Sequence, residues 1–482
     1  PRTPIMCGIL GIIGHDDIAG TLLEGMASIQ HRGQDAAGIV TFNHRFHLHK
    51  ADGLVGQAFK KVDLARFPGK IGLGHVRYAT QGSTDVLDAQ PTVVMYPFGL
   101  AMVHNGNVVN FKQLKQTLCE DRHRLLDTSN DVALILYALA AALEAKNLQN
   151  LTPDDIFDSV RTVQEQVQGA YSALTIIAGH GLLAFTDPHG IRPLVLGRKY
   201  TDRGMVYAFA SETDCFDYLG FETVRDLQPG EAVLIDGEGQ VHSRVCRAEK
   251  QAFCIFEYIY FAREDSVIQG RLVATERVRI GRQLAEQVKQ AGLRPDLVID
   301  VPSSAYFFAS GMAEALGVPY RRGLAKNNHV GRSFIVPTQA RREQIVRQKL
   351  NPLKDVVRGK KVAVVDDSIV RGTTSKHIVK LLRESGAAEI YFVSAAPPIV
   401  CPCIYGIDMS VKREIIAAHY DPKQIAHYLE ADAVIYQSLA DLRALYQDLP
   451  CCYACFSGEY PTGASEELLK QIEQEKECST RN

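Results

Sequence analysis

The pattern of apolar positions predicts different sheets in the two halves of the chain. In the second half, uninterrupted apolar runs at residues 362–365 and 297–301 are typical of parallel strands that are buried on both faces. Helical periodicity follows from Ser375 and runs through residues 271–288. In the first half, short strands alternate with turns, and residues 132–143 form the longest apolar run. That run is too short to cross a bilayer, so it predicts a core helix.

Composition narrows the class of protein. The chain has 482 residues, enough for two to four domains, and its 46% hydrophobic and 22% charged residues are ordinary for a globular protein with ample core. A net charge of −2 gives no sign of the basic surface with which proteins bind nucleic acids or membranes. Because no signal-peptide pattern opens the chain, we expect an intracellular, cytoplasmic protein. In that setting 11 cysteines, an odd number, favour metal binding or catalysis over disulfides.

The strand predicted at 362–365 ends in a candidate phosphate site. Two carboxylates, Asp366 and Asp367, stand at the strand end and accept hydrogen bonds from ribose hydroxyls or help to hold Mg²⁺. Backbone N–H groups of the following turn and helix start cradle a phosphate. The turn residues are Ser368, Arg371, Gly372, Thr373 and Thr374. This stretch resembles the phosphoribosyl-pyrophosphate (PRPP) loop of type I phosphoribosyltransferases. The alternative, a solvated acidic turn, explains the order of residues poorly.

Two further features accompany this loop. A second strand ends at residues 302–304, and the resemblance implies that Ser304 joins Asp366 and Asp367 as a Mg²⁺ ligand. Residues 326–350 contain six basic side chains, namely Lys326, Arg332, Arg341, Arg342, Arg347 and Lys349. Such a segment is often only a solvated face. Between two phosphate-type turns of a nearly neutral protein, it predicts a loop that closes over a polyanionic substrate, with Lys326, Arg332 and Lys349 as PRPP contacts.

The first half carries a separate set of motifs. Cys7 stands directly before an apolar strand, and a lone cysteine there is more often a core residue than a nucleophile. Other motifs in this half of the chain change this interpretation. Each is a polar stretch next to a predicted helix or strand, and they lie at residues 31–38, 74–82, 103–107 and 128–131. Together they resemble the class II glutamine amidotransferase domain, which has an N-terminal-nucleophile fold.

The resemblance implies roles for five residues. Cys7 is the nucleophile that attacks the side-chain amide of glutamine. The Asn105 side chain and the Gly106 backbone N–H hold the oxyanion. Arg77 pairs with the α-carboxylate of glutamine, and Asp131 with its α-ammonium group.

The mechanism of that family also predicts processing of the chain. The α-amino group of the nucleophile is the general base, with an unperturbed pKa near 7.7–8.0. Six residues precede Cys7 and acylate this amine while they are attached. We therefore predict that residues 1–6 are a propeptide or leader and that the active chain starts at Cys7.

Both motif sets in this order resemble the glutamine phosphoribosylpyrophosphate amidotransferase (amidophosphoribosyltransferase) family. The resemblance implies an α+β N-terminal-nucleophile (αββα) domain at residues 7–240 and an α/β phosphoribosyltransferase domain with a parallel sheet at 250–450, followed by a cysteine motif and tail at 451–482. Ammonia from glutamine attacks C1 of PRPP, giving 5-phosphoribosylamine, glutamate and pyrophosphate. One Mg²⁺ per subunit, an ammonia channel, feedback by purine nucleotides and a homotetramer are also implied.

Clustered cysteines at 401–403 and 451–455 allow zinc, an iron–sulfur cluster or reduced thiols. One subgroup of the family carries one [4Fe-4S] cluster per subunit. Cys401 and Cys451 leave the choice of ligand open at two positions. The cluster ligands that the resemblance implies are Cys254, Cys403, Cys452 and Cys455.

Two other classes of protein share some of these motifs but fit the whole set less well. A PRPP-sensing regulator without catalysis has no reason to keep Cys7, Arg77, Asn105 and Asp131. Other glutamine amidotransferases share the first domain only, and the PRPP loop at residues 362–374 excludes them.

Overall fold

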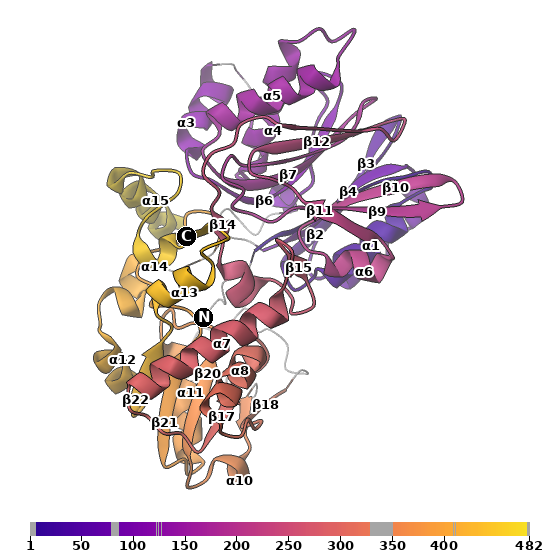
Figure 1. Cartoon of the computed structure of the whole chain (residues 1–482). Coiled ribbons are helices and arrows are strands. Elements are labelled where there is room, and N and C mark those ends of the chain that lie inside the picture. Colours follow the sequence, from indigo (N-terminus) through magenta and orange to yellow (C-terminus); the bar gives the residue numbers. More distant parts are fainter. Residues whose placement is uncertain are drawn as a thin grey trace.

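A computed structural model of the chain describes residues 6–78, 86–121, 123, 125, 126, 128–327, 350–407, 409 and 411–479 (Figure 1). The predicted PRPP contacts Arg332 and Lys349 lie outside the described residues, as do most of the basic segment and residues 1–5 of the predicted leader.

The first domain is built on two antiparallel sheets. In the described part of the chain, one sheet has seven strands and the other has six. In spatial order, the first consists of β11 (Glu222–Asp226), β9 (Val195–Thr201), β10 (Gly204–Ala210), β1 (Gly8–Ile13), β4 (Ile71–Arg77), β2 (Ala36–Asn43) and β3 (Arg45–Asp52). The second consists of β13 (Val241–Val245), β12 (Glu231–Asp236), β8 (Gly181–Thr186), β7 (Gly169–Ile177), β6 (Leu100–Val108) and β5 (Thr92–Val94).

Helices cover the outer faces of these two sheets (Figure 1). They are α1 (Ala19–Ser28), α2 (Val55–Ala58), η1 (Leu64–Arg66), η2 (Val86–Asp88), α3 (Phe111–Lys115), η3 (Gln116–Asp121), α4 (Val132–Glu144), α5 (Pro153–Gln166) and α6 (Asp214–Leu219). One buried cluster joins α4 and α5 to the six-stranded sheet, and another joins α1 and α6 to the seven-stranded sheet. A third fills the space between the sheets, with Ile9, Leu174 and Val233 among its members. The predicted αββα architecture is confirmed.

The second domain has a four-stranded parallel sheet in the order β17 (Leu297–Asp300), β20 (Lys361–Asp366), β21 (Glu389–Ser394) and β22 (Ala433–Tyr436) among the described residues. Alternate residues of β20 enter different cores. Val362 and Val364 pack with α11 (Thr373–Glu384) and α12 (Pro422–Leu429), whereas Ala363 and Val365 pack with α7 (Val273–Gln290) and α8 (Tyr306–Leu316). Burial on both faces explains the uninterrupted apolar run of β20. The predicted α/β domain is confirmed.

Shorter elements complete this half of the chain. They are β14 (Phe253–Cys254), η4 (Glu257–Phe261), β15 (Val267–Ile268), β16 (Arg271–Leu272), β18 (Leu324–Lys326), β19 (Leu350–Pro352), α10 (Lys354–Val357), η5 (Lys412–Glu414), η6 (Ile416–Ala418), α13 (Leu439–Leu445), β23 (Cys451–Cys452), α14 (Ala454–Ser457) and α15 (Glu466–Ser479). None of the helices in the described residues is both long and apolar enough to span a membrane.

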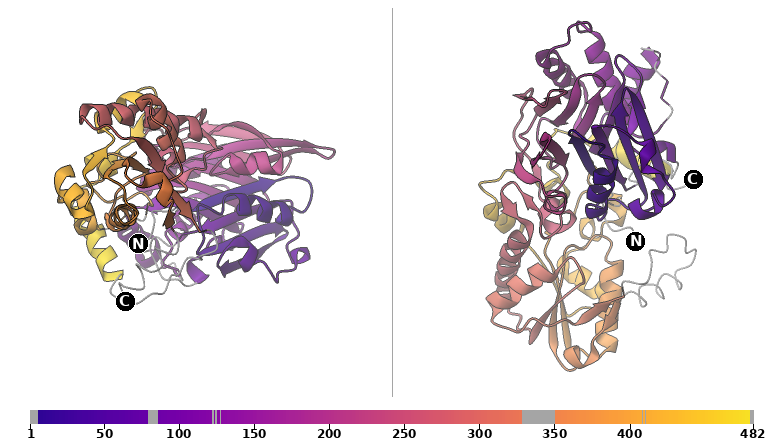
Figure 2. Two further views of the ribbon diagram at one scale, coloured as in Figure 1. Left: turned by 90° about the horizontal axis from the view of Figure 1, so that it is seen from below. Right: turned by 90° about the vertical axis from the view of Figure 1, so that its right-hand side faces the viewer.

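The C-terminal residues lie at the junction of the two domains. The two domains follow each other along the molecule, with α13 and α14 beside β14 where they meet (Figures 1 and 2). β23 pairs in parallel with β14, which brings Cys452 beside Cys254. The boundary expected at residue 240 falls between two paired strands, because β13 pairs with β12 and extends the first domain to Val245.

A buried carboxyl at this junction predicts a pH-dependent stability. Asp226, at the end of β11, accepts a hydrogen bond from the Gln269 backbone N–H at 3.1 Å, and burial raises the pKa of Asp226 to about 6. The stability that its protonated form contributes is complete below the unfolded pKa of about 3.9 and is lost as the pH rises through 6. We expect Asp226→Asn to raise the free energy of unfolding by about 3 kcal/mol above pH 7, and by much less near pH 4.

Thermal unfolding of the wild type and the variant across this pH range checks the prediction. Asp202→Asn, at an exposed position, is the control and should leave the pH profile unchanged. A gain for Asp226→Asn that is equal at pH 4 and pH 8 would contradict the assignment.

Candidate active sites

Cys7 is half-buried and directly precedes β1, the middle strand of the seven-stranded sheet. Its Sγ lies 3.7 Å from the backbone oxygen of Tyr78, which follows the neighbouring strand β4. Burial raises the pKa of the Cys7 thiol, and the charge of Asp131 adds to the rise. The guanidinium groups of Arg77 and Arg32 act in the opposite direction. Arg77 and Asp131 thus lie close enough to Cys7 for their charges to act on its thiol.

Asn105 and Gly106 lie on β6, and the buried amide of Asn105 is the most informative feature of this site. The Asn105 side chain is 1% exposed, and neither its Nδ2 nor its Oδ1 has a hydrogen-bond partner among the described residues. Gly106 has φ +152°, and a Cβ there would lie 1.9 Å from the backbone oxygen of Ala170 on β7. A buried amide without a partner costs free energy, so native proteins rarely retain one without a function.

Asp131 is held in place on both of its oxygens. Its Oδ2 accepts a hydrogen bond from the Val108 backbone N–H at 2.8 Å, and its Oδ1 lies 3.3 Å from His104 Nε2. Burial works against ionisation, but His104 and the backbone donor outweigh it and lower the pKa of Asp131. A carboxylate held by Val108 and His104, both on the strand that carries Asn105, suits an ammonium group of a substrate.

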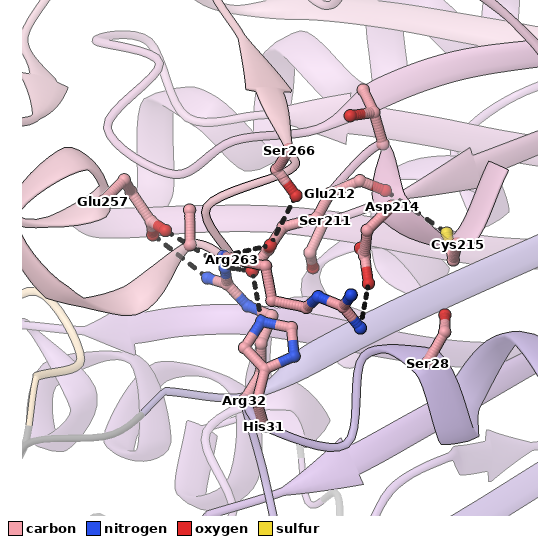
Figure 3. Close-up of polar contacts among 12 residues, drawn as sticks. Ser28, His31, Arg32, Ser211, Glu212, Asp214, Cys215, Glu257, Arg263 and Ser266 are labelled. Carbon is pink, nitrogen blue, oxygen red and sulfur yellow. Dashed lines mark hydrogen bonds and ion pairs between the residues drawn. The ribbon is translucent and has the colours of Figure 1, made fainter. Parts of the chain in front are cut away.

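A buried ionic network around Arg32, Glu212 and Glu257 adjoins the backbone of Cys7, and Figure 3 shows the side chains of the network. Arg32 Nε donates to the backbone oxygen of Cys7 at 3.1 Å, and its two terminal nitrogens each donate to Glu257 at 3.0 Å. Arg32 also donates to Glu212, which His31 Nε2 contacts at 2.9 Å. The guanidinium thus joins the Cys7 backbone to η4, the first helical turn of the second domain.

The close charges of this network shift the pKa values of two of its members, His31 and Asp214. Burial opposes protonation of His31, but the Glu212 carboxylate outweighs it and raises the pKa of His31. Burial and the charge of Glu212 raise the pKa of Asp214 to about 7, although Arg263 lies 3.7 Å away. Figure 3 shows these side chains converging from both domains.

Sequence reasoning missed part of this arrangement. Glu212 and Glu257 are fully buried, as is Arg192, which lies 3.7 Å from Glu257. His104, the partner of Asp131, was not singled out either. The available signal was a lone charge in an otherwise apolar stretch, as for Glu257 in the run from Cys254 to Ala262.

The second candidate site lies at the carboxyl ends of β17 and β20. Ser304 Oγ donates to Asp367 Oδ2, and Ser368 Oγ donates to Asp367 Oδ1 at 2.7 Å. Asp366 Oδ1 accepts the Asp367 backbone N–H at 3.0 Å. Burial raises the pKa of both aspartates, and the charge of Asp367 raises that of Asp366 further. Adjacent buried carboxylates with hydroxyl neighbours fit a hard cation or ligand hydroxyl groups.

Only some of the other predicted residues of this site lie near the carboxylates. Lys326 Nζ, at the end of β18, donates to Ser303 Oγ at 3.3 Å, which brings it to the second strand-end turn. Gly372 has φ +74° and precedes α11, whose first residues Thr373 and Thr374 are exposed. The backbone N–H groups of a helix start are a common place for a phosphate to bind. Arg371 instead pairs with Glu414 at 2.6 Å.

Four thiols line one pocket between the domains. They are those of Cys254, Cys403, Cys452 and Cys455. Cys401 and Cys451 are not among its lining residues. No three His, Cys, Asp or Glu side chains of the described chain converge closely enough to hold a single metal ion. Four thiols that line one pocket without converging on a single point suit a cluster better than zinc, whose bonds to sulfur are about 2.3 Å.

Comparison with known proteins places these sites in a family. The glutamine amidotransferase domain model matches residues 75–218, and the phosphoribosyl transferase domain model matches 271–398. Amidophosphoribosyltransferase of Pasteurella multocida is 44% identical over 486 residues, covering 98% of this chain and 96% of the relative. That of Escherichia coli is 43% identical over 443 residues, covering 91% and 88%. The chain belongs to the amidophosphoribosyltransferase family.

Solved structures agree with this membership. Glutamine PRPP amidotransferase of B. subtilis, complexed with ADP and GMP, has a TM-score of 0.85 and 38% identity, covering 96% of this chain and 98% of that one. A structure described as the allosteric regulatory enzyme of purine biosynthesis has a TM-score of 0.86 and 38% identity, covering 97% and 99%. As an amidophosphoribosyltransferase family member, the chain transfers the amide nitrogen of glutamine to PRPP in purine biosynthesis.

Proposed function

We propose that Cys7 and Asp366–Asp367 mark the two reaction centres of this glycosyltransferase. The main support for the first centre is the side-chain amide of Asn105, which is buried without a hydrogen-bond partner in the same domain as the Cys7 thiol. The carbonyl oxygen of the substrate supplies the hydrogen-bond partner that the Asn105 amide lacks. This hydrogen bond is strongest when that oxygen becomes an oxyanion.

The first half-reaction releases ammonia from glutamine. In this proposal the Cys7 Sγ attacks the side-chain carbonyl carbon, and the thiol proton passes to the α-amino group of Cys7. Asn105 Nδ2 and the Gly106 N–H donate to the oxyanion, while Arg77 and Asp131 hold the amino-acid end of the substrate. The C–N bond then breaks, the amine proton leaves with ammonia, and water hydrolyses the thioester to glutamate. Because this base must be a free amine, we propose that the active chain begins at Cys7.

The second half-reaction forms 5-phosphoribosylamine. Asp366 and Asp367 accept hydrogen bonds from the ribose hydroxyls, and the start of α11 at Thr373 and Thr374 binds the 5′-phosphate. The Ser304, Asp366 and Asp367 oxygens fit Mg²⁺, which when bound neutralises charge on the leaving pyrophosphate. Ammonia attacks C1 of PRPP as the bond from C1 to the pyrophosphate oxygen breaks.

A direct experiment tests the assignment of two centres. Incubation of the enzyme with PRPP, Mg²⁺ and either glutamine or ammonium chloride should release pyrophosphate in both cases, and glutamate only in the first. Failure to release pyrophosphate with either nitrogen donor would contradict the second centre.

We propose further that the four-thiol pocket holds a [4Fe-4S] cluster, whose ligands are thiolates of Cys254, Cys403, Cys452 and Cys455. Arg192 supports this choice, because its buried guanidinium lines the same pocket and offsets the negative charge of the thiolates. The reaction transfers no electrons, so the role of this cluster is structural.

Two adjacent cysteines provide a matched test of the cluster. Cys452 lines the pocket, whereas the Cys451 thiol donates to the backbone oxygen of Leu449 at 3.1 Å. We expect anaerobically purified Cys452→Ser to lose iron, acid-labile sulfide and visible absorption, and Cys451→Ser to retain all three. Equal metal content in both variants would contradict this ligand set, and zinc in place of iron would contradict the cluster.

We also propose that purine nucleotides inhibit the enzyme and that it forms a homotetramer. Support for inhibition comes from the B. subtilis structure, which was determined with ADP and GMP.

A further inference from the structure

A short segment of the second domain lies against the strand that carries the oxyanion donors. Gly406 has φ +102°, and a Cβ there would lie 2.8 Å from the backbone oxygen of Gly106 and 2.9 Å from its carbonyl carbon. The two backbones are thus in van der Waals contact with no space for a side chain. On β6, Gly106 is therefore enclosed by the β7 backbone at Ala170 and by Gly406.

Hydrogen bonds fix the two residues that precede Gly406. The Asn107 side chain, next to Gly106, donates through Nδ2 to the backbone oxygen of Ile404 at 2.9 Å. Arg192 donates from Nε to the backbone oxygen of Tyr405 at 2.9 Å, and a second bond runs from Nη2 to the same oxygen. The donors belong to the first domain and both carbonyls to the second. Each bond is buried, where a lost partner is costly.

Residues 403–406 are also anchored within their own domain. The Tyr405 hydroxyl lies 2.8 Å from Thr462 Oγ1 and accepts the Thr462 backbone N–H at 3.1 Å. The Tyr405 backbone N–H donates to Cys403 Sγ at 3.3 Å. Tyr405 is 1% exposed, so the segment has little freedom to move away from β6.

We infer that residues 403–406 position the oxyanion-binding residues Asn105 and Gly106, so that the second domain completes the glutaminase centre of the first. Residues 403–406 make no contact with the substrate in this proposal and act through Gly106 and Asn107. The inference rests on the proposed roles of Asn105 and Gly106. It predicts that a change at Gly406 lowers the rate of glutamine hydrolysis more than the binding of glutamine, because Gly406 contacts Gly106 directly, whereas Arg77 lies on β4 and Asp131 is held by His104 and Val108.

Gly406→Ala tests the inference, with Gly458→Ala as the matched control. Gly458 also has a left-handed φ, +77°, in the same C-terminal region, but a Cβ there meets only the Cys401 thiol at 3.4 Å. Both variants place a Cβ on a backbone with positive φ, and only Gly406→Ala displaces Gly106. Displacement of catalytic groups by about 1 Å costs roughly 10²-fold in rate.

We therefore expect Gly406→Ala to lower kcat for glutamate release by about 10²-fold with a small change in KM. Transfer from ammonia to PRPP, iron content and alkylation of Cys7 by iodoacetamide should match those of Gly458→Ala. The last readout shows that the nucleophile is intact, since alkylation needs no oxyanion site.

Equal loss of glutaminase kcat in the two glycine variants would overturn the inference, as would a change confined to KM. If Gly406→Ala does not fold, Asn107→Ser removes the bond to Ile404 alone and should lower kcat by about tenfold. An unchanged kcat in Asn107→Ser would then overturn it. The proposed function fails separately, namely when the wild type releases no glutamate or when Cys7→Ala still does.

Discussion

Cys7→Ala will abolish glutamate release and the glutamine-dependent formation of 5-phosphoribosylamine, while ammonia-dependent formation continues. Removal of the nucleophile leaves no route to the thioester, and losses of about 10⁶-fold are typical when a covalent nucleophile is removed. The second centre is built from other residues at the ends of β17 and β20, so it should retain its rate with ammonium chloride.

Cys246→Ala provides the control, because this half-buried thiol follows β13, in another part of the first domain, and donates to the Arg244 backbone oxygen at 3.6 Å. It should match the wild type with both nitrogen donors. Loss of the ammonia-dependent reaction in Cys7→Ala, with normal folding, would mean that Cys7 serves both centres and would contradict their separation.

Asp367→Asn will lower kcat/KM for PRPP by about 10²–10³-fold with either nitrogen donor. The amide preserves the shape of the side chain and an acceptor for Ser304 or Ser368, but it removes the negative charge needed by Mg²⁺ and ribose hydroxyls. Glutamate release measured without PRPP should persist, and its stimulation by PRPP should be lost.

The exposed Asp355→Asn, in the first turn of α10, changes the same charge without reaching the site and should behave as the wild type. A normal kcat/KM for PRPP in Asp367→Asn would contradict the place of this carboxylate in the second centre.

The parts of the fold that depend on local pattern could be predicted from the sequence. The apolar run of β20 indicated a strand buried on both faces, and the two aspartates after it indicated the carboxyl end of a parallel sheet. At residues 297–304 the pattern indicated a second strand end and the resemblance singled out Ser304, which lies next to Asp367 because β17 and β20 are parallel neighbours. The resemblance then supplied the roles that local pattern alone does not determine.

Contacts between distant parts of the chain could not be predicted in this way. Arg32 and Glu257 are separated by 225 positions, and Asn107 and Ile404 by 297. Periodicity reports which face of an element is buried, but it does not identify the partner across a domain interface. For the same reason, the contact of Gly406 with Gly106 and the end of the first domain at Val245 became apparent only in three dimensions.

Glutamate release by anaerobically purified enzyme, with and without PRPP and Mg²⁺, tests most directly whether two coupled centres share this chain. The account predicts slow release with glutamine alone and faster release when PRPP and Mg²⁺ are added. Intact mass should show that the active chain begins at Cys7. A chain that starts at Cys7, contains its iron and still releases no glutamate under either condition would contradict the account.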